Sequence, residues 1–187
     1  GDLEGPVWVD GISGSALEFD GVDDYVKIDS DSAFNLTDVV ISVGINLDDN
    51  EKTNVIVDKI IGGNGYRFVV DSNSKLHFGI GFGTGTGSCE VDVVLEENTW
   101  YHVVGGYWDG GIKFYVNGDY HDGCGYGQTM TFNSDNLYIG SDNGDSGFFN
   151  GTIDEVAIWN RALSSEEISE LYDSYDIPDE DPIAHWK

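Results

Sequence analysis

Positively charged residues are scarce in this sequence. It has 8 Lys and Arg against 35 Asp and Glu, which gives a formal net charge of -27 at pH 7 over 187 residues. A field of that sign repels phosphate backbones and anionic lipid headgroups. We therefore expect no nucleic acid partner and no binding to a membrane surface. Three explanations of the acidity stay open: a solvated acidic surface, adaptation to high salt, and carboxylates grouped to bind cations.

Long apolar runs and cysteines are also scarce. No stretch approaches the ~20 apolar residues that span a bilayer, so membrane insertion is not expected. Cys89 and Cys124 are the only cysteines and they form no C-x-x-C pair, so zinc is not expected. The even count in an apparently extracellular domain favours a Cys89–Cys124 disulfide, and two buried free thiols are the alternative.

Short alternating runs of apolar and polar residues fill most of the chain. They extend from Ala16 to Trp159 and are interrupted by Gly, Asn and Asp, and the whole chain contains nine Phe, ten Tyr and five Trp. Repeated period-2 segments at this spacing predict an all-β sandwich or barrel. The clearest hairpin is IKFYVNGDY, in which Asn117-Gly118 supplies the positive-φ pair of a tight turn.

One short helix is expected near the end of the chain. Glu167 follows Ser164 by three residues, as in a capping box, and Ile168 and Leu171 fall on one helical face. After it, the acidic, proline-bearing segment DIPDEDP is typical of a linker, and the alternating IAHWK that follows predicts a strand. We therefore predict one domain over residues 1–176, followed by a linker and strand over residues 177–187.

Several motifs occur together in a familiar order. They are ALEFDGVDDYV (16–26), WYHV (100–103), FYVNG (114–118), LYIG (137–140) and the stretch from Phe149 to Tyr172 that contains IDEVAIWNRAL. In this order they resemble the laminin-G-like, concanavalin A-like jelly-roll family. The resemblance implies two curved antiparallel sheets packed face to face, in an extracellular domain of a secreted or cell-surface protein. Domains of this kind serve as lectins, adhesion modules, hydrolase appendages or spacers, so the fold alone does not give the function.

The tail IAHWK (183–187) resembles the strand with which family members commonly begin. This resemblance implies either the start of a further copy in a tandem array or a strand that completes a neighbouring unit. Neighbouring repeats of the same kind are therefore expected partners, and repetition would multiply weak affinities.

Acidic residues gather in two segments that lie side by side in this family. Asp20 and Asp23 belong to the first, and Asp154 to the second. Calcium takes about six to eight oxygen ligands, many from carboxylates on turns, and many relatives hold a structural calcium here. We therefore expect Ca²⁺ at Asp20, Asp23 and Asp154. The alternative is that these side chains cap turns and satisfy backbone donors.

Candidate ligand-binding residues come from aromatic side chains near turns. Trp108 and Asp109 lie in YWDGG, where the family usually has a single aromatic residue, so one of the two rings is expected to face outward. An exposed ring beside a carboxylate suits a sugar, and Tyr126 in GCGYGQ is a similar case. The alternative is that the rings of Tyr107 and Trp108 both pack beneath the turn.

Catalysis is not expected. Glu90, Asp92 and Glu96 share one face of a strand and are similar in pattern to jelly-roll glycoside hydrolases. At ~3.3 Å per residue, Glu90 and Glu96 are roughly 20 Å apart, whereas glycosidase pairs lie within about 10 Å. We therefore predict a non-catalytic recognition or adhesion module that binds a glycan or a surface protein. A structural spacer is the alternative, and a glycoside hydrolase-like enzyme is a weaker one.

Overall fold

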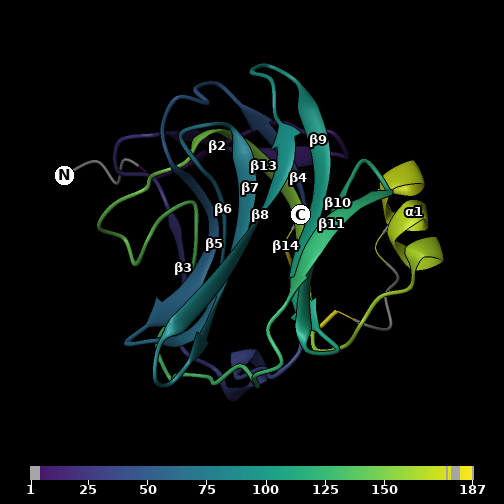
Figure 1. Ribbon diagram of the computed structural model, residues 1–187. Helices are drawn as coiled ribbons and strands as arrows, with labels where there is room; N and C mark the ends of the chain where they lie inside the picture. Colours follow the sequence, from purple (N-terminus) through teal and green to yellow (C-terminus); the bar gives the residue numbers. More distant parts are fainter. Residues whose placement is uncertain (1–4, 176, 178–181, 187) are drawn as a thin grey trace.

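Two antiparallel β-sheets lie face to face in the computed structural model, which describes residues 5–175, 177 and 182–186 (Figure 1). This arrangement confirms the predicted all-β, two-sheet jelly-roll sandwich with one short helix. No helix in the described ranges is long and apolar enough to cross a membrane.

The two sheets are built from strands that are distant in sequence. In spatial order, the first sheet comprises β1 (Val7–Asp10), β2 (Ser15–Asp20), β13 (Asn150–Trp159), β4 (Val39–Leu47), β9 (Trp100–Trp108), β10 (Gly111–Val116) and β11 (Asp119–Gly125), and β14 (Ala184–Trp186) also pairs with β13. The second sheet comprises β3 (Val26–Ile28), β12 (Leu137–Ile139), β5 (Asn54–Ile61), β6 (Asn64–Val70), β7 (Lys75–Phe82) and β8 (Thr86–Val94). A short 3-10 helix covers Ser32–Phe34.

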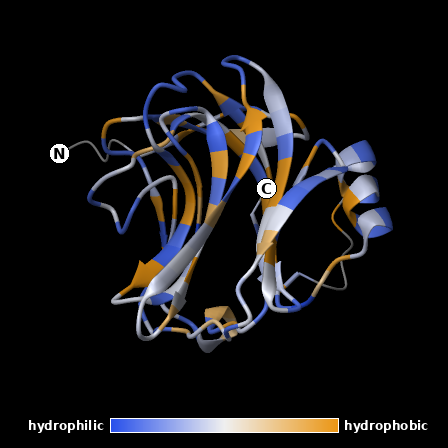
Figure 2. Ribbon diagram, in the orientation of Figure 1, coloured by the Kyte–Doolittle hydropathy of each residue, from blue (hydrophilic) through white to orange (hydrophobic). Residues whose placement is uncertain are grey.

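The main core lies between the sheets. Apolar and polar residues alternate along several of the strands (Figure 2), and in β6 and β7 the buried apolar residues belong to one face, which packs in this core. In β6, for example, Tyr66 and Phe68 are buried in this core, whereas Arg67 points to the other face and binds Asp58 of β5. Packing of the two apolar faces buries them both, which is the main force that holds a sandwich together.

A second, smaller core lies outside the first sheet, beneath helix α1 (Ser165–Ser174). Ile168 and Leu171 of the helix are buried in it. At its start, the Ser164 hydroxyl accepts from the Glu167 amide at 3.2 Å, and the Glu167 carboxylate accepts from the Ser164 amide at 2.7 Å. The predicted capping box and buried helical face are therefore both confirmed.

The turn between β10 and β11 confirms the predicted hairpin. Asn117 and Gly118 have φ values of 51° and 82°, which is the left-handed pair that a two-residue hairpin requires. The turn lies under the helix, because a Cβ at Gly118 would stand 3.2 Å from the Tyr172 ring.

One edge of the sandwich is closed by a covalent bond. Cys89 of β8 and Cys124 of β11 form a disulfide with a Cα–Cα distance of 5.9 Å. Each of these strands is the last of its sheet, so the bond joins the two sheets directly. The predicted disulfide is confirmed.

The C-terminal segment forms a strand on its own domain. In β14, Trp186 pairs with Val156 and Ala184 with Ile158 of β13. Strand β2 pairs with residues 150–153 of β13, so β2 and β14 lie end to end along that strand. Most of the expected linker, residues 176 and 178–181, lies outside the described residues, and the tandem array stays a prediction.

Candidate functional site

Trp108 does not form the expected exposed platform. Its side chain is 4% exposed and packs with Leu163 and Leu171 on the outer face of the first sheet. Successive residues of a strand point to opposite faces, so Tyr107 enters the main core while Trp108 turns outward. Helix α1 and the segment before it then cover Trp108, and Lys113 Nζ lies 4.7 Å from the ring centroid. The prediction of a sugar platform at Trp108 is wrong because this outer face is not open to solvent.

Asp109 and the Tyr126 loop are brought together at one end of the sandwich. Asp109 is exposed, and the Tyr126 amide donates to the Gly110 carbonyl at 3.0 Å. Beside them is a polar cavity of about 500 Å³. Its lining consists of Thr37, Asp38, Tyr107, Asp109, Gly110, Gly127, Gln128 and Thr129.

The ring of Tyr126, predicted to bind a ligand here, already packs against other residues. Tyr126 packs on Phe82 with ring centroids 5.7 Å apart, and its hydroxyl donates to the Ser88 carbonyl. The Tyr107 hydroxyl donates to the Gln128 carbonyl, so it helps to hold the loop closed. This cavity offers carboxylates, amides and hydroxyls but no free aromatic face from either tyrosine.

The acidic turn after β2 brings three carboxylates together. Asp20, Asp23 and Asp24 each place a carboxylate oxygen within 4.8 Å of the others. Asp20 Oδ1 accepts from the Val22 amide at 2.8 Å, and Asp24 Oδ2 accepts from the Asp20 amide at 3.0 Å. The oxygens of the three side chains therefore fit the chemistry of a hard cation such as Ca²⁺. Lys52 Nζ also donates to the Gly21 carbonyl, at 3.0 Å.

Asp154 is not part of this group. Its Oδ2 accepts from the Ser13 amide at 3.1 Å and its Oδ1 from the Glu155 amide at 2.9 Å, and the residue is 2% exposed. Asn150 is the residue of β13 that lies opposite Asp20, so Asp154 stands four positions, or about 13 Å, further along the strand. The predicted trio of Asp20, Asp23 and Asp154 is therefore wrong. Asp24 takes the third place, and Asp154 satisfies backbone donors instead.

A groove runs along the edge of the sandwich that has no disulfide. It lies between β1 and β2 of the first sheet and β3 of the second, and it has a volume of about 650 Å³. Its lining consists of Pro6, Trp8, Ala16, Leu17, Phe19, Tyr25, Val26, Lys27, Ile139, Ile153, Asp154, Val156, His185 and Trp186. The lining is mostly apolar, with one cationic and one acidic side chain and a histidine.

Two exposed aromatic side chains belong to opposite walls of this groove. Trp8 of β1 is 65% exposed, and Tyr25, directly after the acidic turn, is 38% exposed. The Tyr25 ring packs on Tyr138 with centroids 5.9 Å apart, which supports it from behind. Aromatic faces at such a place stack on the apolar faces of sugar rings, and nearby carboxylates accept hydrogen bonds from hydroxyl groups.

Sequence reasoning missed Trp8 because the alternation of its segment, PVWVD, does not reveal which face is covered. The available signal was a tryptophan flanked by two valines and close to the chain's first turn. Only the pairing of β1 with β2, at the outer edge of the sheet, shows that Trp8 remains open.

A buried Ser–His pair lies on the outer face of the first sheet. Ser42 Oγ lies 2.7 Å from His102 Nε2, and each residue is 2% exposed. The rings of Tyr172 and Tyr175 lie 6.0 and 5.9 Å from the imidazole. Burial lowers the pKa of His102 to about 4, so the ring is neutral at pH 7. The pair has the hydrogen bond of a nucleophile and base, but both residues are buried beside the two tyrosines and Leu171 of helix α1.

Solved structures share this architecture at low sequence identity. Domain 4 of an extracellular GH43 arabinanase of Geobacillus stearothermophilus, solved with arabinotriose, is 17% identical over 89% of this chain and 81% of that one, with a TM-score of 0.73. The CBM40 of a Ruminococcus gnavus sialidase, solved with α2,3-sialyllactose, is 11% identical over 79% of this chain and 96% of that one, with a TM-score of 0.64. These likenesses support the fold.

A longer protein of Bacteroides ovatus, described as a candidate carbohydrate-binding protein, is 22% identical with a TM-score of 0.72. The match covers 87% of this chain, which spans about half (48%) of that protein. A search of curated proteins found no significant match. Residues 20–169 match the Laminin_G_3 family, so the chain belongs to the concanavalin A-like lectin/glucanases superfamily.

Proposed function

We propose that this protein is a non-catalytic carbohydrate-binding module that holds a glycan in the groove between Trp8 and Tyr25. The observation that carries the proposal is the 65% exposed Trp8 ring on the wall of an apolar groove of about 650 Å³. A mostly apolar groove with exposed aromatic rings and a few polar groups is typical of a ligand-binding site. Structural neighbours with bound arabinotriose and sialyllactose support this reading.

The charge of the protein narrows the class of glycan. A net charge of -27 repels anionic sugars, and among the described residues Lys27 is the only Lys or Arg in the groove lining. The ligand that suits this groove is therefore a neutral oligosaccharide, with its apolar ring faces against Trp8 and Tyr25 and its hydroxyls toward the acidic turn.

We also propose that Ca²⁺ binds the acidic turn through Asp20, Asp23 and Asp24. The support is the approach of three carboxylate oxygens within 4.8 Å of one another. Tyr25 directly follows this turn, so an ion held there would fix the wall of the groove. The chelator test is a melting curve with and without calcium, because a ligand bound only to the folded state raises the midpoint.

An extracellular location fits the same proposal. The Cys89–Cys124 disulfide persists in oxidising compartments, which include the cell exterior. Free glycans and glycosylated surfaces are present there. A recognition module of this kind would act on secreted or cell-surface carbohydrate.

A glycan array with three proteins tests the binding proposal. The wild type, Trp8→Ala and Tyr120→Ala are each applied with and without Ca²⁺. Tyr120 is a matched control because its side chain is 55% exposed but lies on β11, next to the disulfide edge. We expect neutral oligosaccharides to bind the wild type and Tyr120→Ala equally, and Trp8→Ala to bind at least tenfold more weakly, which is about 1.4 kcal/mol.

Two outcomes would contradict the proposal. A blank array for the wild type would favour a structural spacer. Unchanged binding of Trp8→Ala would move the site away from the groove, and the polar cavity at Asp109 would be the next to test. Because Trp8 is exposed, its removal leaves the core intact, and circular dichroism confirms that the variant is folded.

A further inference from the structure

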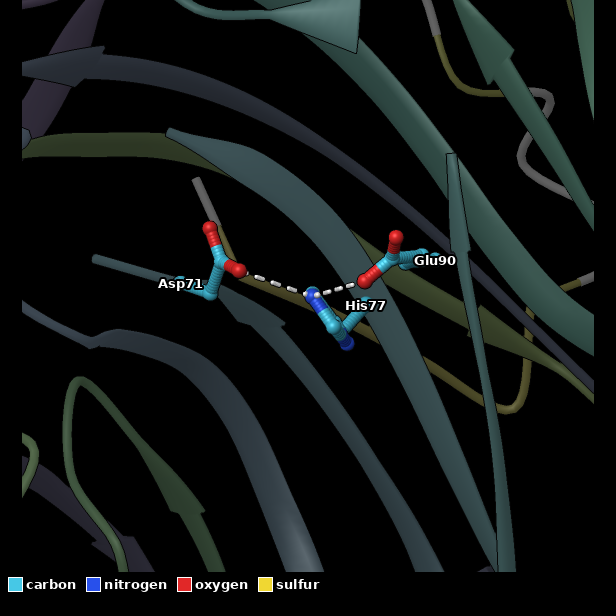
Figure 3. A group of neighbouring side chains, drawn as sticks. All are labelled: Asp71, His77 and Glu90. Atoms are coloured by element: carbon cyan, nitrogen blue, oxygen red, sulfur yellow. Dashed lines mark hydrogen bonds and ion pairs between the residues drawn. The ribbon is translucent and has the colours of Figure 1, made fainter. Parts of the chain in front are cut away.

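A histidine and two carboxylates meet on the outer face of the second sheet, near the disulfide edge (Figure 3). His77 of β7 and Glu90 of β8 are direct partners in the strand pairing. Asp71 lies in the turn before β7. Figure 3 shows both carboxylates directed at the same ring nitrogen, His77 Nε2. This cluster is separate from the groove, since β8 and β3 are opposite ends of the sheet.

One ring nitrogen of His77 faces two carboxylate oxygens, and a single hydrogen bond cannot serve both fully. His77 Nε2 lies 3.0 Å from Asp71 Oδ2 and 3.4 Å from Glu90 Oε2. A ring nitrogen carries at most one hydrogen, so it cannot donate fully to two acceptors. A neutral Nε2 without hydrogen would turn its lone pair toward two negative charges. A single cation among the three atoms would satisfy all of them.

These distances are close to those around a transition-metal dication. Zn²⁺ binds imidazole nitrogen and carboxylate oxygen at about 2.0–2.2 Å, which places pairs of ligand atoms of a tetrahedral site roughly 3.3–3.6 Å apart. The ligand oxygens of Asp71 and Glu90 lie within 4.8 Å of each other, and movement of the exposed Glu90 side chain would bring all three atoms to this spacing. One nitrogen and two oxygen ligands favour Zn²⁺ and similar ions over Ca²⁺, which takes oxygen alone.

Asp71 is held in place by its own turn. Its Oδ1 accepts from the amides of Asn73 at 2.8 Å and Lys75 at 2.9 Å, and Oδ2 accepts from Asn73 Nδ2 at 3.1 Å. Burial raises the pKa of Asp71, but these bonds and His77 lower it overall, so the carboxylate stays ionised. Such supporting hydrogen bonds orient metal ligands in known sites.

Glu90 is anchored through its backbone, and the neighbouring cation Lys75 has another partner. It directly follows Cys89, whose disulfide fixes β8 against β11. Lys75 Nζ lies 2.8 Å from Asp92 but 3.9 Å from Glu90 Oε1, so its main partner is Asp92. Glu90 Oε2 remains directed at His77.

We propose that Asp71, His77 and Glu90 form a binding site for one Zn²⁺-like dication, with Nε2 and one oxygen of each carboxylate as ligands. Three protein ligands leave a fourth position for water or for an oxygen of a bound partner. The sequence offered no sign of this site because its ligands come from a turn and two strands, without cysteine. The inference does not depend on glycan binding.

Titration with ZnCl₂ in the presence of excess CaCl₂, followed by calorimetry, tests the site in the full chain. The calcium competes with Zn²⁺ for the acidic turn of Asp20, Asp23 and Asp24, and a separate titration with Co²⁺ reports through its absorption on nitrogen and oxygen ligands. We expect one Zn²⁺ per chain, with affinity at least tenfold lower in His77→Gln and Glu90→Gln. His121→Gln is the matched control, because His121 is an exposed histidine on β11, and it should bind like the wild type.

Two results would refute the proposed Zn²⁺ site. Absence of saturable Zn²⁺ binding, or equal affinity in the wild type and His77→Gln, refutes it. Melting curves without metal check that each variant is folded. Because no glycan is present, failure here leaves the groove proposal untouched, and failure of the array leaves this site untouched.

Discussion

Removal of the Cys89–Cys124 disulfide should cost a large part of the stability of this domain. The bond spans 35 residues in sequence, and the loss of chain entropy in a loop of that length is worth about 4 kcal/mol in the unfolded state. Domains of this kind have a total stability of about 5–15 kcal/mol. The double substitution Cys89→Ala and Cys124→Ala should therefore remove a quarter to most of it.

Urea unfolding gives the measurement. With a slope of about 1–3 kcal/mol/M, a loss of about 4 kcal/mol lowers the midpoint by more than about 1 M. Wild-type protein in reductant is the matched comparison, because it loses the crosslink but keeps both sulfur atoms. Its midpoint should fall close to that of the double variant.

An unchanged midpoint would refute this reasoning. It would mean that the unfolded chain is already restricted near these residues, so that the crosslink removes little of its entropy. Glycan binding by the double variant at low temperature should stay near the wild-type level, because the groove lies at the opposite edge.

Two further predictions concern the outer face of the first sheet and the C-terminal strand. Burial lowers the pKa of His102 to about 4, whereas its pKa in the unfolded chain is about 6.5. The neutral side chain therefore makes its full contribution to the free energy of unfolding above pH 6.5, and up to about 3 kcal/mol of that contribution is lost as the pH falls toward 4. The difference in urea midpoint between the wild type and His102→Gln should therefore shrink from pH 7 to pH 4.5, and a constant difference would contradict it. The partly buried Trp186 ring stacks on Phe34 with ring centroids 6.2 Å apart. Replacement of Trp186 by Ala should therefore lower the free energy of unfolding by about 2 kcal/mol. An unchanged thermal midpoint would contradict this prediction.

The fold was predictable because local and global preferences agree. Alternation along the strands, the Asn117-Gly118 turn and the Ser164–Glu167 capping box each act over a few residues, and each has the predicted form. The Cys89–Cys124 bond was also within reach, because a chain with two cysteines offers only one intramolecular pairing.

The candidate sites were harder to predict from the sequence, because they depend on which faces of the sheets are covered by other segments. Alternation places Tyr107 and Trp108 on opposite sides of β9, but only the position of helix α1 shows that Trp108 is buried. Strand pairing likewise places Asp154 about 13 Å from Asp20 along β13. Trp8 and the Asp71–His77–Glu90 cluster depend on contacts between separate segments, which periodicity within one segment cannot reveal.

The sandwich is crosslinked at one edge and open at the other, and this asymmetry decides how its sheets move. Because the disulfide fixes β8 against β11, any separation of the sheets is a rotation about that edge. The displacement then grows with distance from the crosslink and is greatest between β1 and β3, where Trp8 and Tyr25 stand. The crosslink therefore restrains the sheets least at the edge that carries these two rings.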